Sequence, residues 1–410
     1  MREPRQHGDE AGRTRRGSAA SALEVLGAAT KLGLTSFGGP IAHVGYFLDE
    51  YVKRRKWIDE QSFADLVALC QFLPGPASSQ VGIAIGIHRA GLLGGLAAWV
   101  GFTFPSAIAM WAVAMAVRGI DPQHAAWLHG LIVVAVAVVA QAVWSLARNF
   151  AGRVSTGTIA IVAAILVLLV PSAYAQVIAI AGGGLAGWLL FRKDPGGARG
   201  ASSTSISRAL GLASLVAFFA LLAGLPVAGQ FIRNKWFDMF EGFYRAGSLV
   251  FGGGHVVLPL LQTVVVPTGW MTNGEFLAGY GAAQAVPGPL FTFSAYLGAT
   301  IFPLARGAPG ALVALGAIFL PAFLLVVGVL PFWDALRARP AIQAALKGVN
   351  ASVVGILLAA LYNPVWVSAI LRPLDLALAL AAFGLLVLWK LPPWIVVIIT
   401  AGAAFGVSFL

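Results

Sequence analysis

The sequence predicts an all-α polytopic membrane protein that contains two homologous repeats of inverted topology. Of the 410 residues, 59% are hydrophobic and only 10% are charged, and the mean hydropathy is +0.85. About 25% of the residues are charged in an ordinary soluble protein. Many apolar runs approach or exceed the roughly 20 residues that a helix needs to cross a bilayer. The third observation is that Pro-Gly-Pro occurs twice inside such runs, at 74–76 and 287–289.

The apolar segments divide the chain into two blocks. We predict a first repeat at 19–191 and a second at 234–410, with the polar linker and a linking helix at 192–233 between them. The apolar segments of the first block lie at about 19–48, 62–88, 91–117, 122–148, 156–170 and 173–191. Those of the second block lie at about 236–265, 275–304, 308–331, 341–363, 373–389 and 392–409. Each repeat is expected to hold two broken or re-entrant helical hairpins and about four spanning helices. Residues 1–18 are polar and Arg-rich, which predicts a disordered cytoplasmic tail without a cleavable signal peptide.

The two blocks align at their most distinctive residues. One constant offset places Glu24 opposite Asp238, Lys31 opposite Arg245, Gly33 opposite Gly247 and Phe37 opposite Phe251. An offset one residue shorter places Trp57 opposite Trp270, Phe63 opposite Phe276, Gln71 opposite Gln284 and Pro74 opposite Pro287. Agreement at so many special residues indicates an internal duplication.

The basic residues predict the topology of the hairpins. Basic clusters at 13–16 and 53–56 flank the first apolar segment, and a single crossing would put them on opposite faces. A re-entrant hairpin with its tip at 38–40 keeps both clusters cytoplasmic. A second hairpin with its tip at 74–76 returns Arg89 to the same side. The second pair of hairpins would then enter from the opposite face, with the N-terminus cytoplasmic and the C-terminus periplasmic.

The breaks in these segments predict a site for an anion. A helix cannot continue through Pro-Gly-Pro, but proline suits the first position of a new helix. Each helix that restarts there points unpaired N–H groups and a positive dipole end at the break, which favours a tetrahedral dianion. Paired breaks in two halves of a chain are typical of a transporter's substrate site. The alternative is that the breaks are packing kinks. The candidate substrate-binding residues at and just beyond the breaks are Gly38, Gly39, Pro74, Gly75, Pro76, Ser78, Ser79, Gly252, Gly253, Gly254, His255, Pro287, Gly288, Pro289 and Thr292, with Gln80 and Ser294 beside them.

Two cations precede the breaks at equivalent positions. Lys31 and Arg245 each lie seven residues, or roughly 10 Å, before their breaks. A cation inside a membrane is costly and usually functional, so both are further candidates for substrate binding. Alternatively they form structural ion pairs with Glu24 and Asp238, two turns earlier, or reach the membrane interface.

Three titratable residues are candidates for proton coupling. Glu24 and Asp238 could carry protons if buried, although near the membrane interface they would be ordinary solvated charges. His43 follows the first break closely and could carry a proton or serve as a hydrogen-bonded structural residue.

The composition also limits the class of function. The sequence has no phosphate-binding loop, no metal-spaced histidine pair and no supported Ser/His/Asp set, so we expect no enzyme, no cofactor and no use of ATP. The single cysteine excludes an intrachain disulfide and a cysteine metal cluster. The net charge of +11 lies in short connections, which indicates membrane topology and anionic lipid rather than nucleic acid.

The motifs at the breaks resemble those of the chromate ion transporter family in its long, two-domain form. They are the stretch 31–43, Gln71-Phe-Leu-Pro-Gly-Pro76, the stretch 251–259 and Gln284-Ala-Val-Pro-Gly-Pro289. The resemblance implies chromate export from the bacterial cytoplasm across the inner membrane, driven by an ion gradient, with sulfate as a close analogue. Gly254 stands where the first half has Pro40, so the two hairpins are not expected to be functionally equal.

Several readings remain open from the sequence. Chromate and sulfate share charge and shape, so sulfate uptake is the nearest alternative to chromate export. An uncoupled anion channel could use the same helix ends, and a membrane scaffold would not transport at all. A homodimer is compatible with such a transporter, although no residue indicates one.

Overall fold

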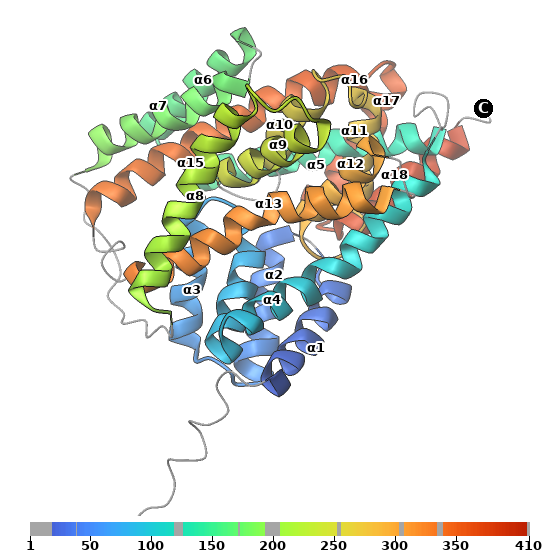
Figure 1. Ribbon diagram of the computed structural model, residues 1–410. Coiled ribbons are helices and arrows are strands. Elements are labelled where there is room, and N and C mark those ends of the chain that lie inside the picture. Colours follow the sequence, from blue (N-terminus) through green and yellow to red (C-terminus); the bar gives the residue numbers. More distant parts are fainter. Residues whose placement is uncertain are drawn as a thin grey trace, which may run out of the picture.

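The computed structural model describes residues 19–37, 39–118, 126–170, 173–192, 206–251, 256–302, 307–333 and 339–407. Within these ranges every regular element is helical, and Figure 1 shows the helices packed around one another in a single body. The predicted tail at 1–18 and the linker residues 193–205 lie outside them. Five helices in the described ranges are long and apolar enough to cross a membrane, namely Ala77–Ala116, His129–Phe150, Arg208–Ala228, Ala308–Phe332 and Pro340–Ala369. The all-helical membrane class predicted from composition is confirmed.

The elements follow the predicted segments closely. The first half contains α1 (Ala19–Thr35), α2 (Gly39–Phe47), the π-helical η1 (Leu48–Arg54), α3 (Glu60–Phe72), α4 (Ala77–Ala116), α5 (Ala126–Phe150), α6 (Val154–Leu169) and α7 (Ala173–Phe191). The linking helix is α8 (Arg208–Ala228). The second half contains α9 (Lys235–Leu249), α10 (Val257–Val265), α11 (Asn273–Ala283), η3 (Leu290–Thr292), α12 (Phe293–Ile301), α13 (Ala308–Val329), η5 (Leu330–Phe332), α15 (Pro340–Ala360), η6 (Leu361–Trp366), α16 (Val367–Ala369), α17 (Pro373–Val387) and α18 (Pro393–Val407).

The first apolar segment folds back on itself as a hairpin. Lys31 of α1 contacts Glu50 of η1 at 2.7 Å, and Glu24 of α1 contacts Arg55, just beyond η1, at 3.6 Å. The residue nearer the start of α1 thus contacts the residue farther along the chain after η1, which is the pairing of antiparallel neighbours. Both ends of the segment therefore lie at one end of the molecule, in the lower part of Figure 1.

The 40-residue helix α4 is also two antiparallel arms. A straight helix of that length would measure about 60 Å, twice the thickness of the hydrocarbon core. The backbone leaves the helical region at Ala90 and Gly91, and a Cβ built on Gly86 would collide with the carbonyl of Gly94. In the second half α12 and α13 make the same turn, where Gly298 and Gly310 are in close backbone contact.

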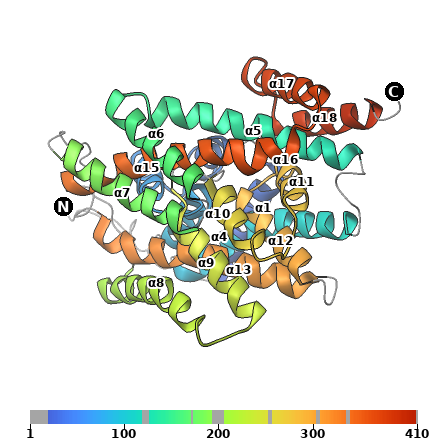
Figure 2. The same ribbon diagram turned by 90° about the horizontal axis from the view of Figure 1, so that it is seen from above.

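The outer helices exchange partners between the halves. The first-half helix α5 packs against α17 and α18, whereas the second-half helix α15 packs against α6 and α7. Figure 2 shows these two groups at opposite ends of the neighbouring helices α5 and α15. The two halves are therefore intertwined.

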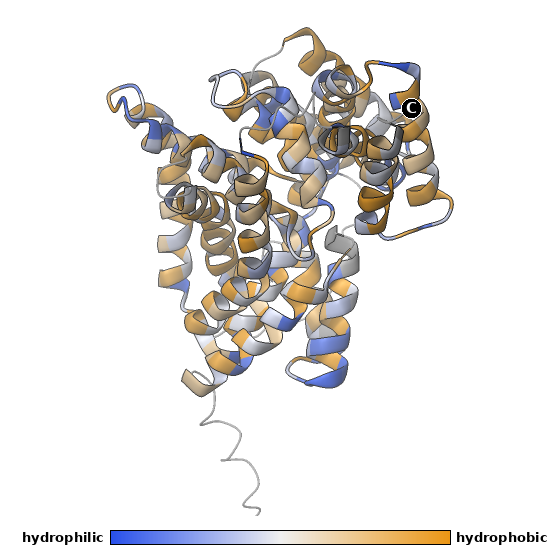
Figure 3. Ribbon diagram, turned by 90° about the vertical axis from the view of Figure 1, so that its right-hand side faces the viewer, coloured by the Kyte–Doolittle hydropathy of each residue, from blue (hydrophilic) through white to orange (hydrophobic). Residues whose placement is uncertain are grey.

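The surface has the polarity expected of a protein surrounded by lipid. Most helices in Figure 3 are hydrophobic along their length, and hydrophilic residues gather mainly at helix ends and connections. Large apolar side chains such as Leu92, Ile108, Leu189 and Phe219 are exposed on the helices. Exposed apolar surface of this extent fits contact with acyl chains rather than water.

Candidate functional site

The helices are interrupted at all four predicted breaks. α1 ends at Thr35 and residues 36–37 are not helical, and residues 73–76 separate α3 from α4. In the second half, α9 ends at Leu249 and residues 250–251 are not helical, and residues 284–289 separate α11 from η3. Five predicted site residues lie outside the described residues, namely Gly38, Gly252, Gly253, Gly254 and His255. The structure thus describes both Pro-Gly-Pro breaks and the residues that enter the two glycine breaks.

Each Pro-Gly-Pro break is hydrogen-bonded to the other half of the chain. The Gly75 N–H donates to the Val250 carbonyl at 2.7 Å. The Gly288 N–H donates to the Ser36 carbonyl at 2.8 Å. Ser36 and Val250 occupy equivalent positions in the two repeats, as do Gly75 and Gly288. The same hydrogen bond between the repeats is therefore formed once from each half. They bring the tips of the first pair of hairpins against the tips of the second.

The central glycines of the two motifs are required by the backbone. Gly75 has a φ of +121° and Gly288 a φ of +90°, where residues with a Cβ are strained. The second tip has one further tie, because the Ser106 hydroxyl of α4 donates a short hydrogen bond to the Pro287 carbonyl. The tips are therefore specific turns fixed from both halves.

A helix N-terminus lies at each Pro-Gly-Pro tip. In α4 the Gln80 N–H donates to the Pro76 carbonyl at 2.9 Å, so the N–H groups of residues 77–79 have no acceptor within their own helix. The second tip starts its helix in the same way, with Thr292 N–H donating to the Pro289 carbonyl at 3.0 Å. Free N–H groups at the positive end of a helix are suited to an anion.

Buried polar atoms without a partner gather in the residues at and near the tips. A buried donor or acceptor without a partner costs about 1–3 kcal/mol, so such atoms are rare away from ligands or ordered water. Those carried by residues at the tips or packed near them are Ser36 Oγ, His43 Nε2, Ser79 Oγ, Gln80 Oε1, Thr103 Oγ1, Gln284 Nε2 and Ser294 Oγ. Both donors and acceptors are among them, which suits a hydrated oxyanion.

His43 is part of this buried polar group. The residue is 1% exposed, and its Nδ1 lies 3.1 Å from the hydroxyl of Ser78, at the start of α4. The carbonyl of Ser36 also faces the ring. His43 therefore connects the entry to the first glycine break with the helix that leaves the first Pro-Gly-Pro break.

The two tips differ in the side chains that follow the prolines. Ser78-Ser79-Gln80 in the first half stands opposite Phe291-Thr292-Phe293 in the second. The Gln80 amide donates to the Pro74 carbonyl at 2.8 Å and leaves its oxygen unpartnered. Phe293 instead packs edge-on against Phe276 in the apolar core. The polar half of the site is thus the first half.

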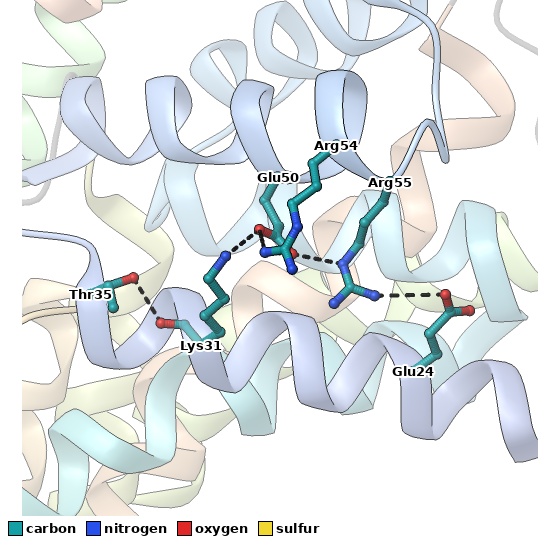
Figure 4. Close-up of polar contacts among 6 residues, drawn as sticks. All are labelled: Glu24, Lys31, Thr35, Glu50, Arg54 and Arg55. Atoms are coloured by element: carbon teal, nitrogen blue, oxygen red, sulfur yellow. Dashed lines mark hydrogen bonds and ion pairs between the residues drawn. The ribbon is translucent and has the colours of Figure 1, made fainter.

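Lys31 does not pair with Glu24. It contacts Glu50 at 2.7 Å, and Glu24 instead contacts Arg55 at 3.6 Å (Figure 4). Glu24 also contacts Arg89 at 2.9 Å. The ion pair considered from the sequence was therefore wrong in its partner. An i,i+7 pair would keep both residues on one helix, whereas the hairpin offers each residue a partner on a neighbouring arm or on the next hairpin.

Arg245 does not pair with Asp238 either. It contacts Glu241 of the same helix at 3.2 Å, one turn away. Asp238 is exposed near the start of α9, and Glu24 is exposed on α1. Of the three candidates for proton coupling, only His43 is buried.

Glu50 is a charged residue of the site region that the sequence reasoning did not single out. Its side chain is 4% exposed and receives hydrogen bonds from Lys31, Arg54 and Arg55. Burial alone would raise the pKa of this carboxyl, but the three cations outweigh it and lower the pKa to about 2. A hairpin tip at 39–40 places residue 48, not residue 50, opposite residue 31, so the predicted register alone would not have found Glu50.

The bases of the hairpins meet around equivalent tryptophans. In the first half, the guanidinium groups of Arg55 and Arg89 lie over the Trp57 ring at 5.0 and 5.4 Å. In the second half, the Lys235 ammonium lies 5.9 Å from the ring centre of Trp270. In each half, the base of the first hairpin thus contacts the base of the second.

The helical fold, with several helices long and apolar enough to cross a membrane, is that of a multi-pass membrane protein. A family model described as chromate transporter matches the chain twice, over residues 23–188 and 237–407. The chain therefore belongs to the chromate transporter family.

Relatives with this description cover most of the chain. A chromate transport protein of Pseudomonas aeruginosa is 30% identical over 388 residues, which are 92% of this chain and 89% of that protein. A chromate transport protein of Cupriavidus metallidurans is 28% identical over 334 residues, 79% of this chain and 78% of that protein. An uncharacterized transporter of Methanocaldococcus jannaschii is 26% identical over 347 residues, 83% of each chain. No solved structure matches the chain at a significant level.

Proposed function

We propose that the chain is a secondary transporter that exports chromate from the bacterial cytoplasm across the inner membrane, driven by an ion gradient. Its membership of the chromate transporter family supports chromate transport. The observation that carries the site is the pair of hydrogen bonds between the repeats, Gly75 to Val250 and Gly288 to Ser36. These bonds bring breaks from both repeats together beside buried polar atoms that lack partners.

In this proposal the hairpin tips form the oxyanion site. The N-terminus of α4 and the helix start after Pro289 each contribute roughly half a positive charge, and free N–H groups bind the tetrahedral oxygens. Ser78, Ser79 and Gln80 supply the polar side chains of the first half. In the second half the hydroxyl of Thr292 donates to the Pro289 carbonyl at 2.8 Å, so this residue contributes to the turn that presents the helix start.

We further propose that the two repeats are inverted in the membrane. The tips of the two hairpin pairs meet, so their bases point away from each other. The base around Trp57 would face the cytoplasm and the base around Trp270 the periplasm. Cysteines introduced at Lys53 and Thr268 should then be labelled from opposite faces by an impermeant reagent, and labelling from one face contradicts the arrangement.

Proton coupling in this scheme belongs to His43 rather than to Glu24 or Asp238. A proton carrier must exchange between the substrate site and one face of the membrane at a time. His43 is buried beside the tips and bonded to Ser78, whereas the two carboxylates are exposed.

Uptake of radiolabelled chromate into inside-out vesicles, with and without a proton gradient, tests the proposed function. Gradient-dependent accumulation, reduced by excess sulfate, is the expected result. Movement of sulfate into right-side-out vesicles without chromate accumulation would identify a sulfate uptake transporter. Flux that is linear in concentration and indifferent to the gradient would identify an uncoupled oxyanion channel.

A further inference from the structure

The base of the first hairpin holds a buried carboxylate inside a shell of cations. Glu50 Oε2 accepts from Lys31 Nζ at 2.7 Å and from Arg54 Nη1 at 3.0 Å, and Glu50 Oε1 accepts from Arg55 Nε at 2.7 Å (Figure 4). We call Lys31, Arg54 and Arg55 the cation cage. Arg54 and Arg55 follow Glu50 by four and five residues, whereas Lys31 lies on the other arm of the hairpin, so the fold brings Lys31 to a carboxylate that the local sequence already pairs.

The cage carries more positive charge than its carboxylates neutralise. Arg55 also contacts Glu24, which in turn contacts Arg89. Each of the four cations of this connected cluster contacts one of its two carboxylates, so the formal net charge of the cluster is +2. That excess equals the charge of one oxyanion dianion.

The groups that hold Glu50 are also those that bind an oxyanion. Ammonium and guanidinium groups donate charge-assisted hydrogen bonds to carboxylate and to tetrahedral oxyanions alike. The carboxylate is 4% exposed, but the side chains of Lys31 and Arg54 are 49% and 60% exposed, so a ligand can reach them from outside. Glu50 lies in the π-helical η1, and π-helical turns often occur at functional sites.

We propose that the cation cage is a second oxyanion site, at the base of the first hairpin pair, where Glu50 occupies the ligand's place until a dianion displaces it. This proposal rests on the proposed function, and its ligand is the same chemical class, a tetrahedral dianion such as chromate or sulfate. The site captures the anion at one face before the anion moves to the hairpin tips.

The second repeat has no equivalent cage among the described residues. Arg245, the counterpart of Lys31, pairs within its own helix with Glu241. The two alignment offsets place Thr263 or Val264 opposite Glu50, and neither carries a charge. The cage is therefore confined to one face, which gives the transport path a preferred side of entry.

Displacement, not protonation, releases Glu50 from the cage. Its pKa of about 2 keeps the carboxylate ionised throughout the physiological range, and η1 lies outside the helices long enough to cross a membrane. The charged groups that face it are the cations Lys31, Arg54 and Arg55. The exchange is therefore expected to be independent of pH between about 5 and 8.

The first test compares two carboxylates of the same cluster. Glu50→Gln and Glu24→Gln are purified as full-length chains in detergent, and sulfate binding is measured by calorimetry at low and high ionic strength. Glu50→Gln removes the built-in competitor and should tighten sulfate binding about tenfold at low salt, with a smaller gain at high salt. Glu24→Gln, which leaves the competitor in place, should change the affinity less than about twofold. Equal affinities in wild type and Glu50→Gln would overturn the proposal.

The second test does not require a change at the buried residue. Arg54→Gln and Lys53→Gln each remove one exposed positive charge from the same helix, but only Arg54 belongs to the cage, since Lys53 pairs with Asp49 at 2.8 Å. Arg54→Gln should weaken sulfate binding about three- to tenfold, and Lys53→Gln less than about twofold. Equal losses in both variants would show a general charge effect and contradict a site. If wild-type protein binds neither sulfate nor chromate, the proposed function fails; if it binds them and the matched pairs do not differ, only the cation cage fails.

Discussion

The two pairs of hairpins have the same backbone plan but different side chains. Both place a Pro-Gly-Pro tip against the other half through a glycine N–H, and both join their bases around a tryptophan. The first pair adds Ser78, Ser79 and Gln80 at its tip and a buried Glu50 at its base. The second pair has Phe291, Thr292 and Phe293 after its prolines, and Thr263 or Val264 opposite Glu50, so it keeps hydroxyl groups but carries no charge at these positions.

This difference separates what the fold needs from what an anion needs. The glycines, prolines and tryptophans recur in both halves because both tips and both bases must be built in the same way. The polar and charged side chains lie mainly in the first half. The first hairpin pair therefore supplies most of the side chains that could bind an anion, and the second pair supplies mainly apolar residues that pack beside them. The following predictions test that division.

The largest effects are expected at the tip glycines, where both halves should respond alike. Gly75→Ala and Gly288→Ala put a Cβ on a backbone with positive φ, at a cost of about 1–3 kcal/mol. The new Cβ also meets Gln80 Nε2 at 2.9 Å in the first variant and the Ser106 hydroxyl in the second. We expect chromate uptake to fall more than about tenfold in both. Gly45→Ala, where no atom lies within 4 Å of the new Cβ, is the control. Full uptake in either tip variant would contradict equal backbone roles.

The next largest effects should distinguish the two helix starts. Gln80→Met keeps the length of the side chain but removes its polar atoms, and we expect oxyanion affinity to fall about tenfold. Phe293→Leu removes packing in the apolar core and should lower the free energy of unfolding by about 1–2 kcal/mol with affinity unchanged. Sulfate calorimetry and thermal unfolding in detergent measure both quantities. An affinity loss in Phe293→Leu of the same size would mean that the two halves bind the anion equally.

A pair of serines should give opposite signatures. Ser79 Oγ is buried without a partner, so Ser79→Ala should keep or slightly raise thermal stability while weakening sulfate binding several-fold. Ser106 donates to the Pro287 carbonyl, so Ser106→Ala leaves that carbonyl without this bond and should cost about 1–3 kcal/mol of stability. Destabilisation by Ser79→Ala, with no change in binding, would identify Ser79 as a structural residue.

The smallest effects are expected at the exposed carboxylates. Glu24→Gln and Asp238→Asn should change stability by at most about 1 kcal/mol, as exposed ion pairs do. Neither should move the pH profile of chromate uptake, whereas His43→Gln should flatten it. The profiles are measured in vesicles between pH 5.5 and 8 at constant membrane potential. A shifted pH profile in Glu24→Gln or Asp238→Asn would show that the substituted carboxylate, rather than His43, takes part in proton coupling.

Much of the fold could be predicted from the sequence because its signals are local. The lengths of the apolar segments predict the membrane helices, and the proline and glycine motifs predict the four breaks. The occurrence of Trp270 at the position equivalent to Trp57 indicates the repeat. Local signals do not identify the partner of Lys31, because Glu50 lies 19 residues further along the chain and their contact depends on how the two arms of the hairpin are aligned. The exchange of α5 and α15 between the halves was also not predicted, since apolar helices carry little information about which apolar neighbour they choose.

The candidate site divides along the same line. Ser78 and Ser79 could be predicted because they follow a break directly. Glu50 and Ser106 could not be, because the first looked like an ordinary residue of a charged turn and the second lies in the middle of a long apolar helix. Tertiary contacts alone give these two residues their roles, with the cation cage and with the Pro287 carbonyl.

The most direct test of the central claim is an X-ray structure of the protein with selenate, a tetrahedral dianion located by its anomalous signal. The account predicts a selenium peak between the hairpin tips, with its oxygens within hydrogen-bond distance of the N–H groups at the start of α4 and of Ser79 Oγ. A weaker peak at the cation cage would agree with the second site. Tips without a peak at saturating selenate, with the anion bound only elsewhere, would contradict the assignment of the tips as the transport site.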